Sequence, residues 1–295
     1  MLKQGILITS EFAEYHPIVN LCYFLLAVGI TMFTLNPIFL SVSVVCAYIY
    51  SVLLGGMPAL KFNIATMFVV GIIMTFINGF FSHNGATVLF YLNDNRITKE
   101  AFIYGLVSSI MLTTVIVWFS CFNRIMNSEK LVYIFGKFAP VIGLTLSMIF
   151  RFVPLLKTRY AEIHQGQQSM VGNQKMSIRD KISLRLKEVS ILISWSLESS
   201  IETADSMAAR GYGLRGRTSF TIFKFSRRDS VLLVLMVIFG GITIFGFSQG
   251  VGQMYFYPLI DVGKVTPLLM VSVVSYFLLL LLPILLDVWG TRKWK

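Results

Sequence analysis

Long stretches without charged residues dominate the first half and the last quarter of this chain. They are Tyr15–Leu60, Phe62–Asn93, Ala101–Asn123, Ser230–Ile260 and Val265–Leu286. A helix that crosses a bilayer needs about 20 apolar residues. The first stretch has 46 residues, and Leu35-Asn36-Pro37 favours a turn near its middle, so it can supply two spans. The pattern therefore predicts six spans, at Ile18–Leu35, Ile38–Leu54, Ala65–Phe81, Ala101–Phe122, Val231–Phe247 and Thr266–Leu286.

The segment 138–150 is also apolar, but it is shorter than a span. Only 13 residues separate Lys137 from Arg151, and Pro140 lies near the start of the segment. We therefore expect a buried or interfacial helix here rather than a full crossing.

The stretch 151–228 is the longest one outside the predicted spans, and its apolar pattern is helical. Between Lys181 and Arg210 there is no glycine or proline, and apolar residues recur every three or four positions. Gly211 follows directly and suits the end of a helix. A second helix is predicted through Arg159–Met170, with its stop at Gly172. We expect two helical arms, each ending at a glycine.

Composition identifies the class of protein. Of the 295 residues, 56% are hydrophobic and 13% are charged, and the mean hydropathy is +0.74, whereas a soluble domain carries about 25% charged residues. The expected fold class is an all-α integral membrane protein with about six transmembrane helices and a cytoplasmic helical domain. We expect four membrane helices in 1–123, the cytoplasmic domain in 124–229, and two membrane helices with a cytoplasmic tail in 230–295.

The net charge of +11 is concentrated in one segment. Arg151–Arg228 carries 14 basic and 6 acidic residues, which is +8 of the total. Because basic residues favour the cytoplasmic side of short loops, Lys61, Arg124 and Lys130 indicate that both termini are cytoplasmic in a multi-pass protein of the cell membrane. The basic segment suits either contact with anionic lipid headgroups or docking of a cytoplasmic partner. No nucleic-acid-binding module is recognisable, so we expect no nucleic acid as a partner.

The sequence contains few signs of chemistry. It has no G-x-x-x-x-G-K-[ST] phosphate loop, and Gly211–Gly216, although it spells G-x-G-x-x-G, follows a predicted helix instead of a strand. The three cysteines and three histidines lack metal-ligand spacing. The predicted spans hold no ionisable side chain except cysteine and tyrosine, which argues against a transporter with its own coupling ion. We expect no catalytic residue, no metal and no cofactor.

The most distinctive motif lies at the end of the second helical arm. Small residues at 208 and 209 allow close approach of another surface, and Arg210 follows them with a planar head that can bind carboxylates or carbonyls in a bidentate manner. The alternative is an arginine that only interacts favourably with the helix dipole, which contributes about 0.3–1 kcal/mol.

The stretch Met207–Tyr212 resembles the second Ala-Arg-Gly motif of the transmembrane T components (EcfT/CbiQ-like) of energy-coupling factor (ECF) importers, a class of ATP-binding-cassette (ABC) transporter. Tyr15-His16-Pro17 is similar to the start of the family's first span, and Phe150–Pro154 resembles its Leu-Arg-Phe-x-Pro entry to the coupling helices. The number of spans and the long cytoplasmic segment before the last two also agree with the family.

This resemblance implies a coupling subunit without catalysis of its own. In the family, two coupling helices dock into two ABC ATPase subunits, and the membrane face holds a small substrate-binding S component for uptake of a vitamin or other micronutrient. The matching ATPase-docking residues here are Ala209, Arg210 and Gly211 in the second arm and Met170, Val171 and Gly172 in the first, with Arg151 and Pro154 at the entry to the coupling helices.

The first docking motif departs from the family pattern, because Val171 stands where an arginine is expected. Either the first ATPase contact is apolar, or Lys175 or Arg179 supplies the charge from a shifted position. Two other functions stay open. One is the permease of a conventional ABC transporter with its own substrate path, and the other is a membrane enzyme whose basic segment binds phosphorylated substrates.

Overall fold

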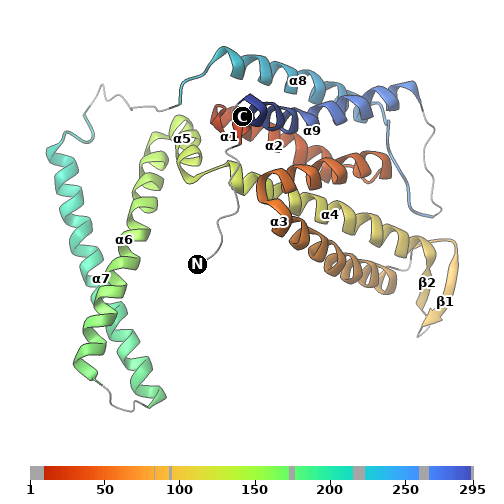
Figure 1. Ribbon diagram of the computed structural model, residues 1–295. Coiled ribbons are helices and arrows are strands. Elements are labelled where there is room, and N and C mark those ends of the chain that lie inside the picture. Colours follow the sequence, from red (N-terminus) through yellow and green to blue (C-terminus); the bar gives the residue numbers. More distant parts are fainter. Residues whose placement is uncertain are drawn as a thin grey trace. The chain divides into compact units, whose positions relative to one another are not determined.

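The computed structural model describes residues 10–82, 84–92, 95–172, 177–214, 223–258 and 266–293, and most of them are helical (Figure 1). Lys175 and Gly216 lie outside the described residues. In chain order the elements are α1 (Glu11–Glu14), α2 (Pro17–Met32), α3 (Pro37–Phe81), β1 (Val88–Leu92), β2 (Asn95–Thr98), α4 (Lys99–Ile125), α5 (Ser128–Phe138), α6 (Pro140–Val171), α7 (Ile178–Ala209), α8 (Arg227–Ser248) and α9 (Pro267–Lys293).

The prediction of an all-α membrane protein is confirmed. Five helices in the described part of the chain are long and apolar enough to cross a bilayer, namely α3, α4, α6, α8 and Pro267–Gly290 of α9. Helix α2 is apolar as well but has only 16 residues. Four predicted spans correspond to α2, α4, α8 and α9, whereas the remaining two fall within α3.

The chain divides into two compact units. Unit 1 consists of Met1–Asn127 and Phe223–Lys295 and contains α1–α4, α8 and α9. Unit 2 consists of Ser128–Ile222 and contains α5–α7. Unit 2 thus falls inside the segment 124–229 that we expect to be the cytoplasmic domain.

The interior of unit 1 is built around aromatic rings. Trp118 of α4 is fully buried, and the rings of Tyr23, Phe24 and Tyr50 lie 6.0–6.4 Å from its ring, centroid to centroid. Lipid tails are as apolar as these side chains, so close packing of their shapes, rather than escape from the solvent, holds membrane helices together. The close packing of these rings therefore holds α2, α3 and α4 together.

Four buried polar side chains in unit 1 form a hydrogen-bond network. Thr31 Oγ1 lies 2.8 Å from Ser43 Oγ and 2.7 Å from Tyr276 OH, and Trp118 Nε1 donates to Ser43 Oγ at 3.1 Å. Each polar group in a bilayer must find its partner inside the protein. This network links α2, α3, α4 and α9 without a charged side chain.

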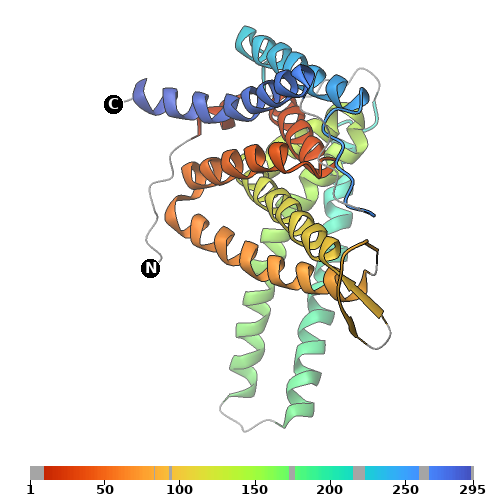
Figure 2. The same ribbon diagram turned by 90° about the vertical axis from the view of Figure 1, so that its right-hand side faces the viewer.

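Helix α3 contains both the second and the third predicted span, and it bends sharply between them (Figure 2). The bend lies at Gly56, whose φ of 65° is accessible to glycine at little cost. Tyr48 OH donates to the carbonyl of Asn63 at 3.2 Å, and Asn63 Nδ2 donates to Ser51 Oγ at 2.7 Å. In a straight helix, residues 12 to 15 apart would be separated by roughly 18–22 Å. The expected loop between the two spans is therefore a bend of helical residues.

Arg124 of α4 supports this bend. Its Nη1 donates to the carbonyl of Leu54 at 2.9 Å. In a regular helix the amide of residue 58 would donate to that carbonyl, but Pro58 has no N–H. Arg124, which the sequence indicated only as a cytoplasmic charge, replaces the missing donor.

Two buried aspartates fasten the N-terminal segment to the C-terminal helices. Asp287 of α9 accepts from Ser10 Oγ at 2.9 Å and from the amide of Phe12 at 2.9 Å. Asp229 of α8 accepts from the amide of His16 at 2.9 Å and from Ser226 Oγ at 2.7 Å. Ser10 and Asp287 are 277 residues apart along the chain.

The segment between α3 and α4 contains a small antiparallel hairpin. Strands β1 and β2 pair with Tyr91 opposite Arg96. Glu100, buried in the first turn of α4, accepts hydrogen bonds from the amide and the hydroxyl of Thr87. This carboxylate therefore joins the hairpin to α4.

In unit 2 the structure differs from the prediction for the segment 138–150. That segment is not a separate buried helix, because its residues from Pro140 onward begin α6, which continues for 32 residues to Val171. An interfacial position of these residues stays a prediction. Gly143 is the only residue of α6 that is buried, among those whose burial is described. Length and composition alone would allow α6 to cross a bilayer. The sequence did not indicate that α6 is continuous, because Arg151 ends the apolar run while the helix continues through it.

Candidate functional site

The second predicted docking motif lies at the C-terminal end of α7. Gly211 has a φ of 82°, its amide donates to the carbonyl of Ala208, and the amide of Tyr212 donates to that of Met207, both at 3.0 Å. This pair of bonds is a Schellman motif, which ends a helix through backbone contacts alone. Arg210, the residue before the glycine, is exposed.

The first predicted docking motif lies at the C-terminal end of α6. Gly172 also has a positive φ, 62°, and its amide donates to the carbonyl of Gln168 at 3.1 Å. Met170 is 82% exposed, whereas Val171 is half-buried. Arg179, one of the two residues considered as a substitute for the missing arginine, is exposed in the first turn of α7. Both arms thus end at a glycine with positive φ, but they differ in their capping bonds and in the side chains that they present.

The predicted entry residues lie inside a helix instead of at its start. Helix α6 begins at Pro140, so Arg151 and Pro154 are a third of the way along it. Arg151 is exposed. Pro154 cannot donate a backbone hydrogen bond, yet the helix continues through it, and Thr158 Oγ1 donates to the Pro154 carbonyl at 3.2 Å.

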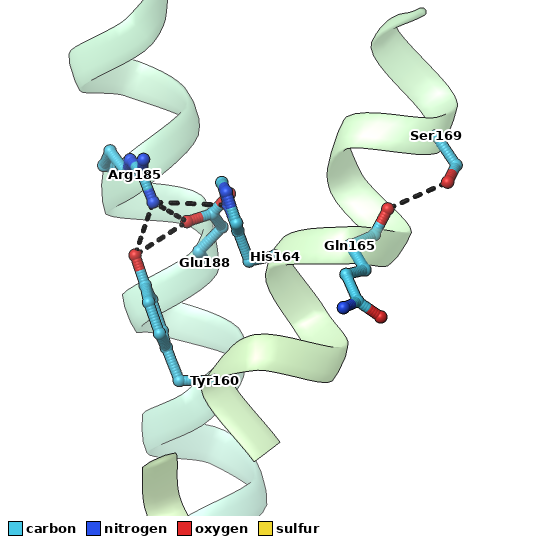
Figure 3. A network of polar contacts seen from close by, with 6 residues as sticks. All are labelled: Tyr160, His164, Gln165, Ser169, Arg185 and Glu188. Carbon is cyan, nitrogen blue, oxygen red and sulfur yellow. Dashed lines mark hydrogen bonds and ion pairs between the residues drawn. The ribbon is translucent and has the colours of Figure 1, made fainter. Parts of the chain in front are cut away.

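Helices α6 and α7 form an antiparallel hairpin in unit 2, held by a polar cluster that sequence reasoning missed (Figure 3). Glu188 of α7 is fully buried. Its Oε1 lies 2.7 Å from His164 Nδ1, and its Oε2 accepts from Tyr160 OH at 3.2 Å. Arg185 Nη1 donates to Tyr160 OH at 2.6 Å and lies 3.3 Å from Glu188 Oε2. We refer to Tyr160, His164, Arg185 and Glu188 as the Glu188 clamp.

The proton positions in the Glu188 clamp follow from its chemistry. A carboxylate only accepts hydrogen bonds, so the Nδ1 of His164 carries the proton in this contact. Arg185 Nη1, 3.2 Å from the same Nδ1, then faces another donor and directs its hydrogens to Tyr160 and Glu188. The rings of Tyr160 and His164 lie nearly parallel, with their centroids 6.0 Å apart.

The clamp keeps the Glu188 carboxyl ionised. Burial by itself raises the pKa of this group, but the hydrogen bond and charge of His164, followed by Tyr160 and Arg185, outweigh it. The pKa of Glu188 therefore lies below its ordinary value of 4.5.

A second contact joins α6 and α7 farther from their connection. The rings of Phe152 and Trp195 are stacked, with centroids 6.1 Å apart, and the guanidinium of Arg159 lies 5.1 Å from the centroid of the Trp195 ring. Cation–π contacts at exposed positions contribute about 0.5–1 kcal/mol. Both contacts pair the later part of one helix with the earlier part of the other, which places the predicted docking motifs of α6 and α7 at opposite ends of the hairpin.

Most apolar residues of α7 are exposed and point away from the hairpin interior, whereas Leu184, Leu192 and Trp195 are half-buried. Seven of the exposed ones recur at intervals of three or four and are at least 44% exposed. They are Ile178, Ile182, Leu186, Val189, Ile193, Leu197 and Ile201, and we call them the α7 stripe. The acidic residues that the sequence placed on another face, Glu198, Glu202 and Asp205, are exposed as well.

The pattern that could have revealed the clamp is local. Tyr160 and His164 are four residues apart, and Arg185 and Glu188 are three apart, so each pair shares a helical face. The partnership between the two faces is not visible in the sequence. Within the described residues there is no group of three or more His, Cys, Asp or Glu side chains that could hold a metal ion.

Comparison with known proteins bears on this arrangement. The family model described as "CbiQ: Cobalt transport protein" matches residues 14–220, which include α6, α7 and both predicted docking motifs. A search of curated proteins found no significant match.

Proposed function

Because the chain belongs to the CbiQ family of cobalt transport proteins, the family of ECF transporter T components, we propose that it couples ATP hydrolysis by two partner ATPases to a membrane-embedded S component. The chain is a multi-pass membrane component of a transport system. In this proposal it is not an enzyme and binds no cofactor. The S component selects the cargo, which is a vitamin or another micronutrient, including cobalt.

The observation that carries the proposal is the hairpin of α6 and α7. Each helix has 32 residues and ends at a glycine with positive φ. Because backbone hydrogen bonds cap such a helix end, the side chain before the glycine is not needed for capping and can contact a partner. Arg210 is exposed at such an end, and its planar head suits carboxylates or backbone carbonyls in an ATPase groove. We propose Ala209, Arg210 and Gly211 as one ATPase-docking site.

The end of α6 is proposed as the other docking site. It presents an exposed Met170 next to a half-buried Val171 and Gly172. The apolar character of this end supports the alternative in which one ATPase offers an apolar groove. Arg179 is the described residue that could add a charge nearby. The two ATPase subunits would then differ in the grooves that receive the arms.

The α7 stripe is proposed as part of the contact with the S component. It extends from Ile178 to Ile201, which is about 35 Å along a helix, and it is too large to be a set of scattered surface residues. Leu197→Glu should weaken co-purification of the S component, because it would bury an unpaired charge in the contact. Ser194→Glu is the matched control, since Ser194 is exposed on α7 but outside the stripe. Equal losses in both variants would contradict the assignment.

We propose that both termini and unit 2 are cytoplasmic, as the distribution of basic residues indicates. Tyr91 in β1 and Gln168 in α6 are exposed and lie on opposite sides of the membrane in this topology. A cysteine at Tyr91 should react with an impermeant maleimide in whole cells. A cysteine at Gln168 should react only after lysis, and the reverse pattern would overturn the orientation.

Co-purification in mild detergent tests the proposed function. The tagged chain should bring down two ATPase chains and a separate small apolar protein, identified by mass spectrometry, and Arg210→Ala should reduce the recovered ATPase. Reconstituted ATPases with this chain alone should not import substrate. Import without a further membrane protein would instead identify the permease of a conventional ABC transporter, and turnover by the isolated chain would identify an enzyme.

A further inference from the structure

Directional contacts hold the α6–α7 hairpin together, and no apolar side chain of α7 is fully buried beside them. Glu188 is the only residue of α7 that is buried, while the α7 stripe is exposed. Two-helix hairpins ordinarily bury apolar residues between them. Here the contacts between the helices include the Glu188 clamp and the stacked pair of Phe152 and Trp195, while apolar residues of α7 such as Leu184 and Leu192 are only half-buried. The contact that orients α6 on α7 therefore depends on a buried carboxylate.

Directional contacts permit fewer arrangements than apolar ones do. Glu188 receives both of its α6 donors, Tyr160 OH and His164 Nδ1, from side chains one helical turn apart. A slip of one residue moves these donors by about 1.5 Å along the axis and turns them by roughly 100°. The carboxylate would then be buried without its partners, which is strongly unfavourable. An apolar seam would tolerate the same slip much better.

We propose that Glu188 is a positioning residue that fixes the crossing of α6 over α7, so that motion imposed at one ATPase-docking end reaches the other as movement of a rigid body. The transmission part of this inference rests on the proposed function, whereas the fixed crossing does not. Arg185 has a supporting role, since its guanidinium holds the Tyr160 hydroxyl while that hydroxyl donates to Glu188. The α7 stripe stays outward and free for a partner because the clamp occupies the inner face.

Pulsed electron paramagnetic resonance on the whole chain tests the fixed crossing. Spin labels are placed at Ser147 of α6 and Ser200 of α7, both exposed and near the open end of the hairpin, after alanine replaces the native cysteines. Helix α7 rises about 18 Å between Glu188 and Ser200, so a change of about 10° in the crossing moves the label by about 3 Å. The wild-type clamp should produce one narrow distance distribution.

Glu188→Gln removes the charge that all three donors share. Its distribution should broaden or shift by several ångströms, and Tyr160→Phe, which removes one donor and leaves the ion pair, should produce a smaller change. Glu198→Gln is the matched control, because it removes the same charge from an exposed position on the same helix. A Glu188→Gln distribution equal to that of wild type would overturn the inference. If Glu188→Gln fails to fold, an unchanged distribution in Tyr160→Phe overturns it as well.

Reconstituted transport tests the consequence. At equal amounts of assembled complex, Glu188→Gln should lower the substrate imported per ATP hydrolysed severalfold, and Glu198→Gln should leave this ratio unchanged. A purely structural role would lower the amount of complex without changing the ratio. An unchanged ratio together with broadened distances would overturn the rigid-body part of the inference. If no ATPase associates with the wild type, the proposed function fails, while the spin-label result still decides the fixed crossing.

Discussion

Replacement of Arg210 by alanine tests whether α7 docks through its C-terminal side chain. The helix end should survive the change, because it depends on backbone bonds from Gly211 to Ala208 and from Tyr212 to Met207, each 3.0 Å long. Arg210 is exposed, and surface substitutions away from special contacts change the free energy of unfolding by less than about 0.5 kcal/mol. The variant should therefore unfold at the wild-type temperature.

The expected loss appears in binding. A hydrogen bond that involves a charged group contributes about 1.5–3 kcal/mol, so the dissociation constant for one ATPase should rise roughly 10- to 150-fold. Arg210→Lys keeps the charge but loses the planar arrangement of donors. Its dissociation constant should lie between those of the wild type and the alanine variant.

The assay is a titration of purified ATPase against the chain in lipid nanodiscs, with thermal unfolding followed in parallel. Lys187→Ala is the control, because it removes one positive charge from another exposed position on α7. A dissociation constant for Arg210→Ala equal to that of Lys187→Ala would refute the docking role. Arg210 would then be an arginine that only interacts with the helix dipole.

Four further predictions concern other parts of the chain. Val171→Arg should preserve or increase co-purification of ATPases if α6 docks as α7 does, and its loss would indicate an apolar groove in the partner. Asp287→Ala should lower the midpoint of thermal unfolding more than Asp287→Asn, because alanine leaves two donors of the N-terminal segment without an acceptor. Each unpaired donor costs about 1–3 kcal/mol of stability. Equal midpoints for the two variants would contradict this account. Arg124→Ala should lower the midpoint of thermal unfolding only slightly. The guanidinium is exposed, and its hydrogen bond to the carbonyl of Leu54 contributes about 1 kcal/mol. A midpoint above that of the wild type would argue against a capping role. The crossing of α6 over α7, followed with the spin labels, should be constant near neutral pH and loosen below pH 4.5. A carboxylate with a lowered pKa stabilises the fold at pH values above its ordinary pKa, and it no longer does so once it is protonated. Glu188→Gln should abolish the pH dependence.

Most of the helices could be predicted from the sequence because their signals are local. Uncharged runs located α2, α4, α8 and α9, and the three-to-four spacing located α7 to within a few residues. Gly172 and Gly211 were predicted to end the two arms, and both have a positive φ, Gly172 directly after α6 and Gly211 two residues after the last residue of α7. A glycine stop depends on the backbone of its own turn, so no distant residue is needed to predict it.

The prediction was less successful where a helix passes through an interruption. Arg151 divided an apolar run, which concealed that α6 is continuous from Pro140. Lys61 likewise suggested a loop, whereas the structure keeps it in α3 just after the bend at Gly56. A charged residue shows where a side chain meets water or lipid headgroups, but it does not stop the backbone hydrogen bonds of a helix.

The sequence by itself determined the class of protein, most of the helical segments and the glycines that end the two helical arms, because composition and periodicity act over neighbouring residues. Only the tertiary structure decided that Glu188 is the buried residue of α7 while the α7 stripe faces outward. It also decided that Asp287 meets the N-terminal segment, 275 residues away along the chain. The burial and pairing of a carboxylate depend on which helix packs against it. That packing depends on contacts between residues far apart in the sequence, so a local sequence pattern cannot predict it.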